Sequence, residues 1–182
     1  VAERYEEAEA TLQSGLAIQK IGSDPLMRSE FYTLFGDIAF RQNRTEEAFA
    51  YYDKALENNP QNYGALNNYS YYLALLGKNL DKAERMSGEV IKANPDNATY
   101  LDTYAWVYFK QGRYSLARLY LKKALDLSKE ASAEMYEHYG DVLAVTGNES
   151  EAVGWWKKAV DAGGDSEILH RKIAEKRYIG NE

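Results

Sequence analysis

Apolar residues return with helical spacing along most of this chain. Between Ala98 and Gln111 they fall on one face of a helix, at Leu101, Tyr104, Ala105 and Tyr108. Gly112 interrupts the run, and the segment from Tyr114 to Leu127 repeats the pattern with Ala117, Leu121, Ala124 and Leu125. The two segments therefore predict a pair of amphipathic helices joined by a short turn.

The same pair returns every 34 or 35 residues. Small residues mark three positions of the repeat: Gly36, Ser70, Ala105 and Gly140; Ala48, Ala83, Ala117 and Ala152; and Ala55, Val90, Ala124 and Ala159. A large residue precedes each member of the first set, at Phe35, Tyr69, Tyr104 and Tyr139. Since helices cross closely only where side chains are small, this period predicts stacked copies of one helix pair.

These positions resemble the tetratricopeptide repeat (TPR) family. The first copy matches its pattern at Tyr32, Phe35, Gly36, Ala48, Tyr52, Ala55 and Pro60, and the fourth at Tyr136, Gly140, Ala152, Trp156 and Ala159. The second copy departs at Ser70, Leu73, Ser87 and Val90, and Asn79 predicts a one-residue insertion. The resemblance implies an all-α fold, a right-handed α-solenoid of stacked antiparallel helix pairs (the TPR superhelix) with a C-terminal capping helix.

We expect residues 1–182 to form a single TPR array. Its predicted parts are the second helix of a truncated upstream repeat (1–24), four repeats (29–62, 63–97, 98–131 and 133–165) and a capping helix (166–178). Because the chain begins with Val1 inside a repeat, we expect further repeats or another domain upstream. A polar terminal helix would cover the last apolar face of the stack.

Composition excludes several classes of function. The net charge of −6 argues against nucleic-acid binding, which requires a basic surface. No apolar stretch approaches the roughly 18 residues of a membrane-spanning helix, so we expect no membrane insertion by this segment. The one basic cluster, His170 to Arg177, is interpreted as a solvated capping face; contact with a membrane or an acidic partner is the alternative.

The sequence offers little for catalysis. Cysteine is absent, and the two histidines, His138 and His170, lie far apart without the spacing of a zinc site. No glycine-rich loop precedes a helix, so we expect no cofactor. Glu137, His138 and Asp141 share part of one helix, but without a nucleophile they are interpreted as polar residues lining a groove.

The remaining chemistry is recognition. In the family the first helices line a concave groove, which here selects Asp37, Phe40, Arg41, Asn67, Asn68, Tyr71, Asp102, Trp106, Phe109, Lys110, Glu137, His138 and Asp141. Aromatic rings give contact area, and asparagine amides bond the backbone of an extended peptide. Each ring could equally pack between neighbouring first helices, because large aromatic residues are usually mostly buried.

Some relatives grip the C-terminal carboxylate of a partner with groove lysines. Here Thr33 and Asp37 stand where that clamp has a lysine and an asparagine, and only Asn68 matches. The fourth repeat is acidic through Glu134, Glu137 and Asp141. We therefore expect no carboxylate clamp, and a partner segment that is neutral or basic with apolar anchors.

The function expected is a non-catalytic scaffold that binds a peptide or protein segment in its groove. Segments such as Ala65–Leu73 and Leu101–Trp106 also resemble bacterial envelope-associated TPR proteins, which favours a periplasmic or lipid-anchored location over the cytoplasm. Two alternatives stay open. The array could be a spacer or oligomerisation module that self-associates around Leu12, Leu16 and Ile18, or an accessory domain of a larger enzyme.

Overall fold

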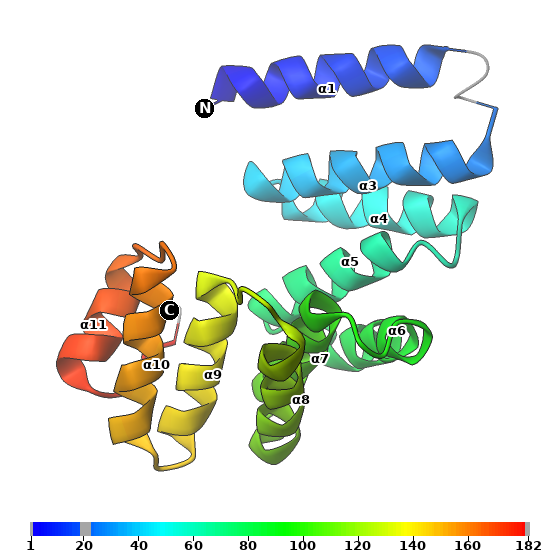
Figure 1. Cartoon of the computed structure of the whole chain (residues 1–182). Helices are drawn as coiled ribbons and strands as arrows, with labels where there is room; N and C mark the ends of the chain where they lie inside the picture. The colour runs from blue at the N-terminus through cyan, green and yellow to red at the C-terminus, as the bar shows by residue number, and fades with distance from the viewer. Residues whose placement is uncertain (1, 19–22, 181–182) are drawn as a thin grey trace. The chain divides into compact units, whose positions relative to one another are not determined.

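Helices joined by short turns and loops make up the part of the chain that the structure describes. The computed structural model describes residues 2–18 and 23–180, and Val1 and residues 19–22 of the predicted 1–24 segment lie outside that part. The helices are α1 (Ala2–Ala17), α3 (Pro25–Arg41), α4 (Thr45–Asn58), α5 (Tyr63–Leu75), α6 (Leu80–Ala93), α7 (Ala98–Lys110), α8 (Tyr114–Leu127), α9 (Ala133–Val145), α10 (Glu149–Asp161) and α11 (Glu167–Glu175) (Figure 1). The predicted all-α fold of antiparallel helix pairs is confirmed.

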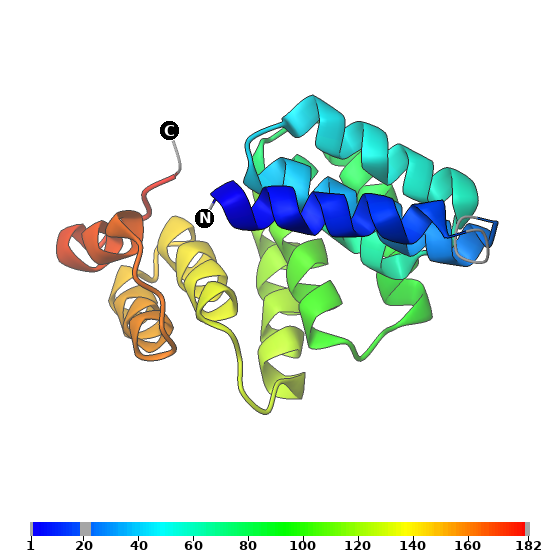
Figure 2. The same ribbon diagram turned by 90° about the horizontal axis from the view of Figure 1, so that it is seen from above.

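The contacts divide the chain into two compact units, Val1–Tyr72 and Leu73–Glu182. In unit 1, α3 and α4 form an antiparallel pair and α1 packs along α3, as seen from above in Figure 2. Tyr52 and Phe49 of α4 pack on Tyr69 of α5, with ring centroids 5.3 and 5.0 Å apart. In unit 2, α7 pairs with α8 and α9 with α10, while α6 packs on α7, α8 on α9 and α11 on α10.

Polar residues begin several helices and satisfy their free N–H groups. The side chains of Asn97, Ser132 and Ser166 accept hydrogen bonds from the backbone N–H groups three residues further on. The turns within pairs need left-handed backbone, which Gly112 and Gly147 supply with φ values of +74° and +83°. The turn before α6 contains one residue more, and Asn79 adopts φ +46° there, which confirms the predicted insertion.

Where the two helices of a pair cross, a large side chain of the second helix packs against a glycine of the first helix in two of the repeats. Tyr52 and Trp156 are fully buried against Gly36 and Gly140 of the preceding helices. A Cβ atom on Gly36 would lie 2.9 Å from the Tyr52 ring, and one on Gly140 would lie 2.5 Å from the Trp156 ring. The other two repeats have Ser70 and Ala105 at the glycine position, and smaller residues, Ser87 and Leu121, in place of the ring. The small positions that define the period therefore make room for the second helix.

This packing predicts the effect of filling the space at Gly140. Gly140→Ala should lower the free energy of unfolding by about 1 to 3 kcal/mol, because the buried Trp156 ring cannot move aside without strain. Urea denaturation followed by circular dichroism measures the change. Gly154→Ala in α10 is the matched control, since nothing lies within 4 Å of its added Cβ. It should stabilise the helix by about 0.5 to 1 kcal/mol. Equal effects of the two substitutions would contradict the packing argument.

Candidate functional site

The predicted groove residues all lie on the first helices of the pairs, but few of them face solvent. Arg41 is exposed, and Asp37, Phe40, Asn68, Tyr71, Lys110 and Glu137 are half-buried. The remaining ones are buried: Asn67, Asp102, Trp106, Phe109, His138 and Asp141. Most of these side chains therefore contact their neighbours in the fold, and the surface that remains open is smaller than the sequence pattern indicated.

In unit 1, Asp37 joins two repeats. Its carboxylate accepts a hydrogen bond from the Tyr52 hydroxyl of its own repeat and another, of 3.1 Å, from the Asn68 amide of the next. Burial raises the pKa of Asp37 above its ordinary value, although the two hydrogen bonds and the Arg41 charge favour the ionised form. Asp37 is the ninth residue of its repeat and Asn68 the sixth of the following one.

The same arrangement recurs in unit 2. Asp141, also a ninth residue, accepts hydrogen bonds from Trp156 Nε1 (2.9 Å) and Lys172 Nζ (2.7 Å). Lys172 occupies the sixth position of the helix that follows. Trp106, the ninth residue of the preceding repeat, stacks on His138, the sixth residue of the next, with centroids 3.8 Å apart. At each of these three contacts, the ninth residue of one repeat contacts the sixth residue of the element that follows it in the same unit.

His138 has a second partner. Its Nδ1 lies 3.1 Å from an oxygen of Asp102, and both side chains are buried. Burial opposes the charged imidazolium, but the charge and hydrogen bond of the adjacent Asp102 carboxylate outweigh this effect and raise the pKa of His138 above its ordinary value. His138 therefore belongs to a polar network between helices α7 and α9.

The position of Lys172 corrects one interpretation of the sequence. The sequence predicts that it lies on a solvated capping face, yet its side chain is only 4% exposed and pairs with Asp141 and Glu137 at 2.7 Å each. The other basic residues of the cluster, His170, Arg171, Lys176 and Arg177, are exposed as expected. Because Lys172 compensates two carboxylates of the fourth repeat, the acidity of that repeat no longer gives a reason to expect a basic partner.

The aromatic residues of the predicted groove are buried in unit 2 and half-buried in unit 1. Trp106 and Phe109 stack at 4.6 Å and are 6% and 5% exposed. Tyr178, beyond α11, lies edge-on to Phe109 at 5.4 Å, and burial raises the pKa of Tyr178 to about 12. In unit 2 the rings therefore pack within the fold. In unit 1, Phe40 stacks on Tyr72 at 3.8 Å and stays half-buried, as does Tyr71.

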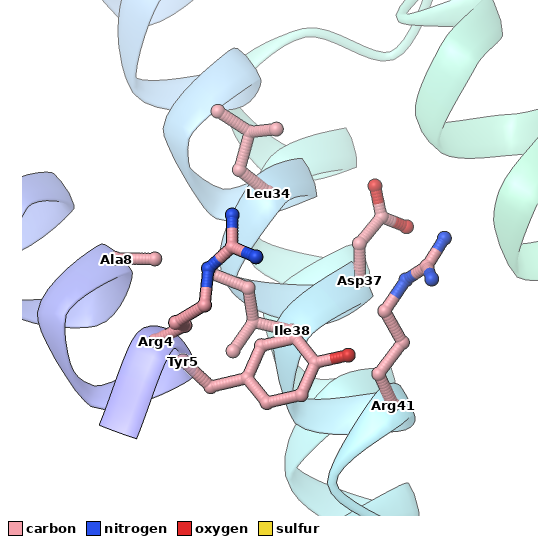
Figure 3. A pocket seen from close by; sticks show the side chains of 7 residues that line it. All are labelled: Arg4, Tyr5, Ala8, Leu34, Asp37, Ile38 and Arg41. Atoms are coloured by element: carbon pink, nitrogen blue, oxygen red, sulfur yellow. The ribbon is translucent and has the colours of Figure 1, made fainter. Parts of the chain in front are cut away.

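An open pocket lies between α1 and α3 in unit 1. It has a volume of about 500 Å³ and is lined by Arg4, Tyr5, Ala8, Leu34, Asp37, Ile38 and Arg41. Figure 3 shows side chains from both helices facing this common space, with apolar groups between the two arginines. Of the predicted groove residues it includes Asp37 and Arg41. Sequence reasoning missed the α1 residues, although the likeness of α1 to a second helix without its first helix was the signal.

The described part of the chain contains neither a candidate metal site nor a candidate membrane-spanning helix. Within it, no group of three or more His, Cys, Asp or Glu side chains is placed to hold a metal ion. None of the helices described there has the length and apolar character needed to cross a membrane.

Comparison with known proteins agrees with the geometry of the pairs. Family models described as "Tetratricopeptide repeat" match residues 29–62, 51–85, 73–132 and 103–167. The chain belongs to the tetratricopeptide repeat family. Proteins of this family are typically non-catalytic, and their repeats generally mediate protein–protein interactions.

Individual relatives of this TPR chain are distant. It is 32% identical over 134 residues to the TPR repeat-containing protein MJ1428 of Methanocaldococcus jannaschii, covering 74% of this chain but only 23% of that protein. The solved structure of PilW, a type IV pilus biogenesis factor, is similar with a TM-score of 0.77 and 17% identity, covering 96% of this chain and 79% of PilW. PilF of Pseudomonas aeruginosa has a TM-score of 0.72 and 18% identity, with 96% and 77% covered. The likeness to these structures is one of fold.

Removing the Lys172 charge tests its role between α9 and α11. Lys172→Met should lower the free energy of unfolding by about 3 to 5 kcal/mol, because Asp141 stays buried without its cation. Lys157→Met on α10 is the matched control, since Lys157 is exposed. It should change stability by less than about 0.5 kcal/mol. Urea denaturation measures both, and a near-neutral Lys172→Met would show that the ion pair is not structural.

The raised pKa of Asp141 predicts that the free energy of unfolding changes with pH. Burial raises its pKa from the ordinary 3.8 to about 6, although the adjacent Lys172 charge acts in the opposite direction. Since the folded state holds this proton more tightly, the stabilisation from it is complete below pH 3.8 and is lost as the pH rises through about 6. Asp141→Asn removes that dependence. The stability of Asp141→Asn relative to wild type should therefore rise between about pH 4 and pH 7, as measured by urea denaturation across this range. A constant difference would contradict the raised pKa.

Proposed function

We propose that this chain is a non-catalytic protein–protein interaction scaffold that binds a peptide or protein segment along its first helices, without a carboxylate clamp. The open pocket between α1 and α3 is the observation that carries the proposal. It combines exposed apolar surface from Leu34, which is 47% exposed, with the charge of Arg41. Buried apolar anchors and a charged rim are the usual composition of a protein-binding surface.

The burial of the other predicted groove residues favours a binding site in unit 1, because those in unit 2 are mostly buried. In unit 2, Trp106 and Phe109 already pack against His138 and Tyr178, and Asp141 is paired with Lys172. A ligand there would have to displace contacts of the fold. In unit 1, Phe40 and Tyr71 are half-buried, and Phe40 lies on α3, the helix that also carries Leu34 and Arg41 of the pocket. We therefore propose that Arg41, Leu34, Phe40 and Tyr71 contribute most to binding.

A second candidate is a spacer or oligomerisation module that uses the outer helices. One observation favours it: α8 carries a depression of about 530 Å³ lined by Ser115, Arg118, Leu119, Lys122, Lys123 and Asp126. Leu119 is 62% exposed, more than Leu34. An interaction through this face would leave the first helices free.

Matched variants distinguish the two surfaces. Peptides are selected from a displayed library against the full chain, and their affinities are measured by fluorescence anisotropy. Leu34→Asp and Arg41→Glu should each weaken binding at least about tenfold, because they remove an apolar anchor and reverse a charge. Leu119→Asp and Arg118→Glu make the same changes on α8 and should leave binding within about twofold.

The opposite pattern would assign binding to α8, and self-association abolished by Leu119→Asp in sedimentation would support the oligomerisation module. Circular dichroism confirms that each variant is folded. A library that yields no ligand sensitive to Leu34 or Arg41 would refute the proposed site.

The fold resembles that of PilW, a type IV pilus biogenesis factor, and the sequence resemblance favours a location in the bacterial envelope. We retain that location as part of the proposal. Fractionation of cells that express the full-length protein, followed by immunoblotting, tests it, and recovery in the cytoplasmic fraction alone would contradict it.

A further inference from the structure

One aromatic contact in unit 2 comes from a segment outside the helices. Helix α11 ends at Glu175, and Lys176 adopts the left-handed backbone conformation, with φ +52°, in which many helices stop and the chain turns. Two residues further on, the Tyr178 ring lies edge-on to Phe109 of α7, with ring centroids 5.4 Å apart. Residues 176–180, which we call the tail, therefore run from α11 to the first helix of the third repeat.

Tyr178 of the tail lies on the surface that the first helices share in unit 2. Besides Phe109 of α7, the Lys172 Nζ of α11 lies 5.5 Å from the centroid of its ring. Burial raises the pKa of Tyr178, and the charges of Asp141 and Glu137 on α9 add to this effect, so both carboxylates lie near its hydroxyl. Phe109, Glu137 and Asp141 are residues that the sequence selected for the peptide groove. The tail therefore covers part of the surface on which a ligand was expected.

The contacts that hold Tyr178 are weak ones. Its ring is half-buried, and it makes an edge-on contact with Phe109 and a cation–π contact with Lys172. Among the described residues, its hydroxyl has no hydrogen-bond partner. Tyr52, a structural tyrosine of α4, is by contrast fully buried, and its hydroxyl donates a hydrogen bond to Asp37. A side chain held as Tyr178 is can be exchanged for a similar ring without breaking a buried hydrogen bond.

The first repeat shows how the same position is covered when the cover belongs to a repeat. Phe40 and Phe109 are both the twelfth residue of their repeats, and Phe40 stacks on Tyr72 at 3.8 Å. Tyr72 is the tenth residue of the next repeat and lies on α5, so helix packing fixes its place. The fourth repeat has Val142 at that position, and the ring over Phe109 comes from Tyr178 instead. The cover of Phe109 is therefore the one that can leave without moving a helix.

We propose that the surface around Phe109 is a binding subsite for an aromatic side chain of an extended partner segment, and that the tail occupies it as an intramolecular ligand. A tyrosine or phenylalanine of the partner takes the place of Tyr178, and the tail is displaced. This inference goes beyond the proposed function, because it places a second site in unit 2 that uses neither Leu34 nor Arg41.

The short connection to α11 makes the tail an effective competitor. A ring tethered in this way has an effective concentration of about 1 mM or more near its site. The apparent affinity of a partner is reduced by the fraction of chains in which the site is open. If the tail occupies the site in about nine chains out of ten, its removal raises that affinity about tenfold.

The probe is a synthetic peptide of residues 173–180, added to the isotopically labelled full chain and followed by NMR titration. Two control peptides carry Tyr178→Phe and Tyr178→Ser. The phenylalanine peptide should bind within about twofold of the native one, because the hydroxyl has no hydrogen bond to lose. The serine peptide, which lacks the ring, should bind at least about tenfold more weakly.

Variants of the full chain test whether its own tail competes. Tyr178→Ser should raise the affinity for the native peptide at least about tenfold over wild type, whereas the matched Tyr178→Phe chain, which keeps the ring, should bind like wild type. Adding Phe109→Leu to the Tyr178→Ser chain keeps apolar volume but removes the ring partner, and should weaken binding at least about tenfold. Circular dichroism checks that each variant is folded.

The outcomes separate a masked site from a purely structural cover. If the folded Tyr178→Ser chain binds the native peptide no more tightly than wild type, or if the serine peptide binds as tightly as the native one, the inference is overturned. If Tyr178→Ser does not fold, wild type at millimolar peptide decides: shifted signals of Phe109 and Tyr178 support displacement of the tail, and unchanged signals overturn it.

The pocket variant Leu34→Asp keeps this inference separate from the proposed function. It should leave the affinity of the Tyr178→Ser chain for the native peptide within about twofold. A larger loss would show that the peptide binds in the pocket of unit 1 and would overturn the inference. Failure of the proposed site at Leu34 and Arg41 would leave the affinities measured here unchanged.

Discussion

Contacts between the ninth residue of one repeat and the sixth residue of the next are the constraint on which the rest of this structure depends. In unit 1 the pair is Asp37 and Asn68, and in unit 2 the pairs are Trp106 with His138 and Asp141 with Lys172. The chemistry differs among a hydrogen bond, a ring stack and a buried ion pair, but the positions are the same. Because each repeat contacts only its neighbours, such nearest-neighbour contacts contribute to how firmly successive helix pairs are joined.

This constraint decides which side chains remain for recognition. A carboxylate or ring at the ninth position faces the surface that first helices share, where a ligand could also bind. Once it is bound to the next repeat, as Asp141 is to Lys172, it no longer offers a charge to a partner. In the described part of the chain, the pocket between α1 and α3 stays open, and there Arg4 and Arg41 border apolar residues. This pocket is the proposed binding site for a partner.

The sequence predicted the fold well because the signals are local. The pairings of Gly36 with Tyr52 and of Gly140 with Trp156 each lie within one repeat, and a glycine or asparagine with positive φ marks each turn within a helix pair. The exposure of the predicted groove residues could not be predicted as well, because it depends on other repeats. Trp106 lies on a first helix like Tyr71, yet it is buried because His138 stacks on it. In the sequence, Lys172 is one of several charged residues on a polar helix. Its burial depends on the position of Asp141 on another helix, which the sequence of its own helix does not indicate. Tyr178 likewise covers Phe109 from outside any repeat.

A double-mutant cycle on Asp141 and Lys172 tests the central claim most directly. The free energies of unfolding of wild type, Asp141→Asn, Lys172→Met and the double variant give the coupling between the two side chains. If the ninth-to-sixth contact joins the last two repeat elements, the coupling energy should exceed about 1 kcal/mol, and the double variant should be more stable than the sum of the single effects implies. Effects that add to within about 0.3 kcal/mol would show that the two residues act independently, and would contradict the account.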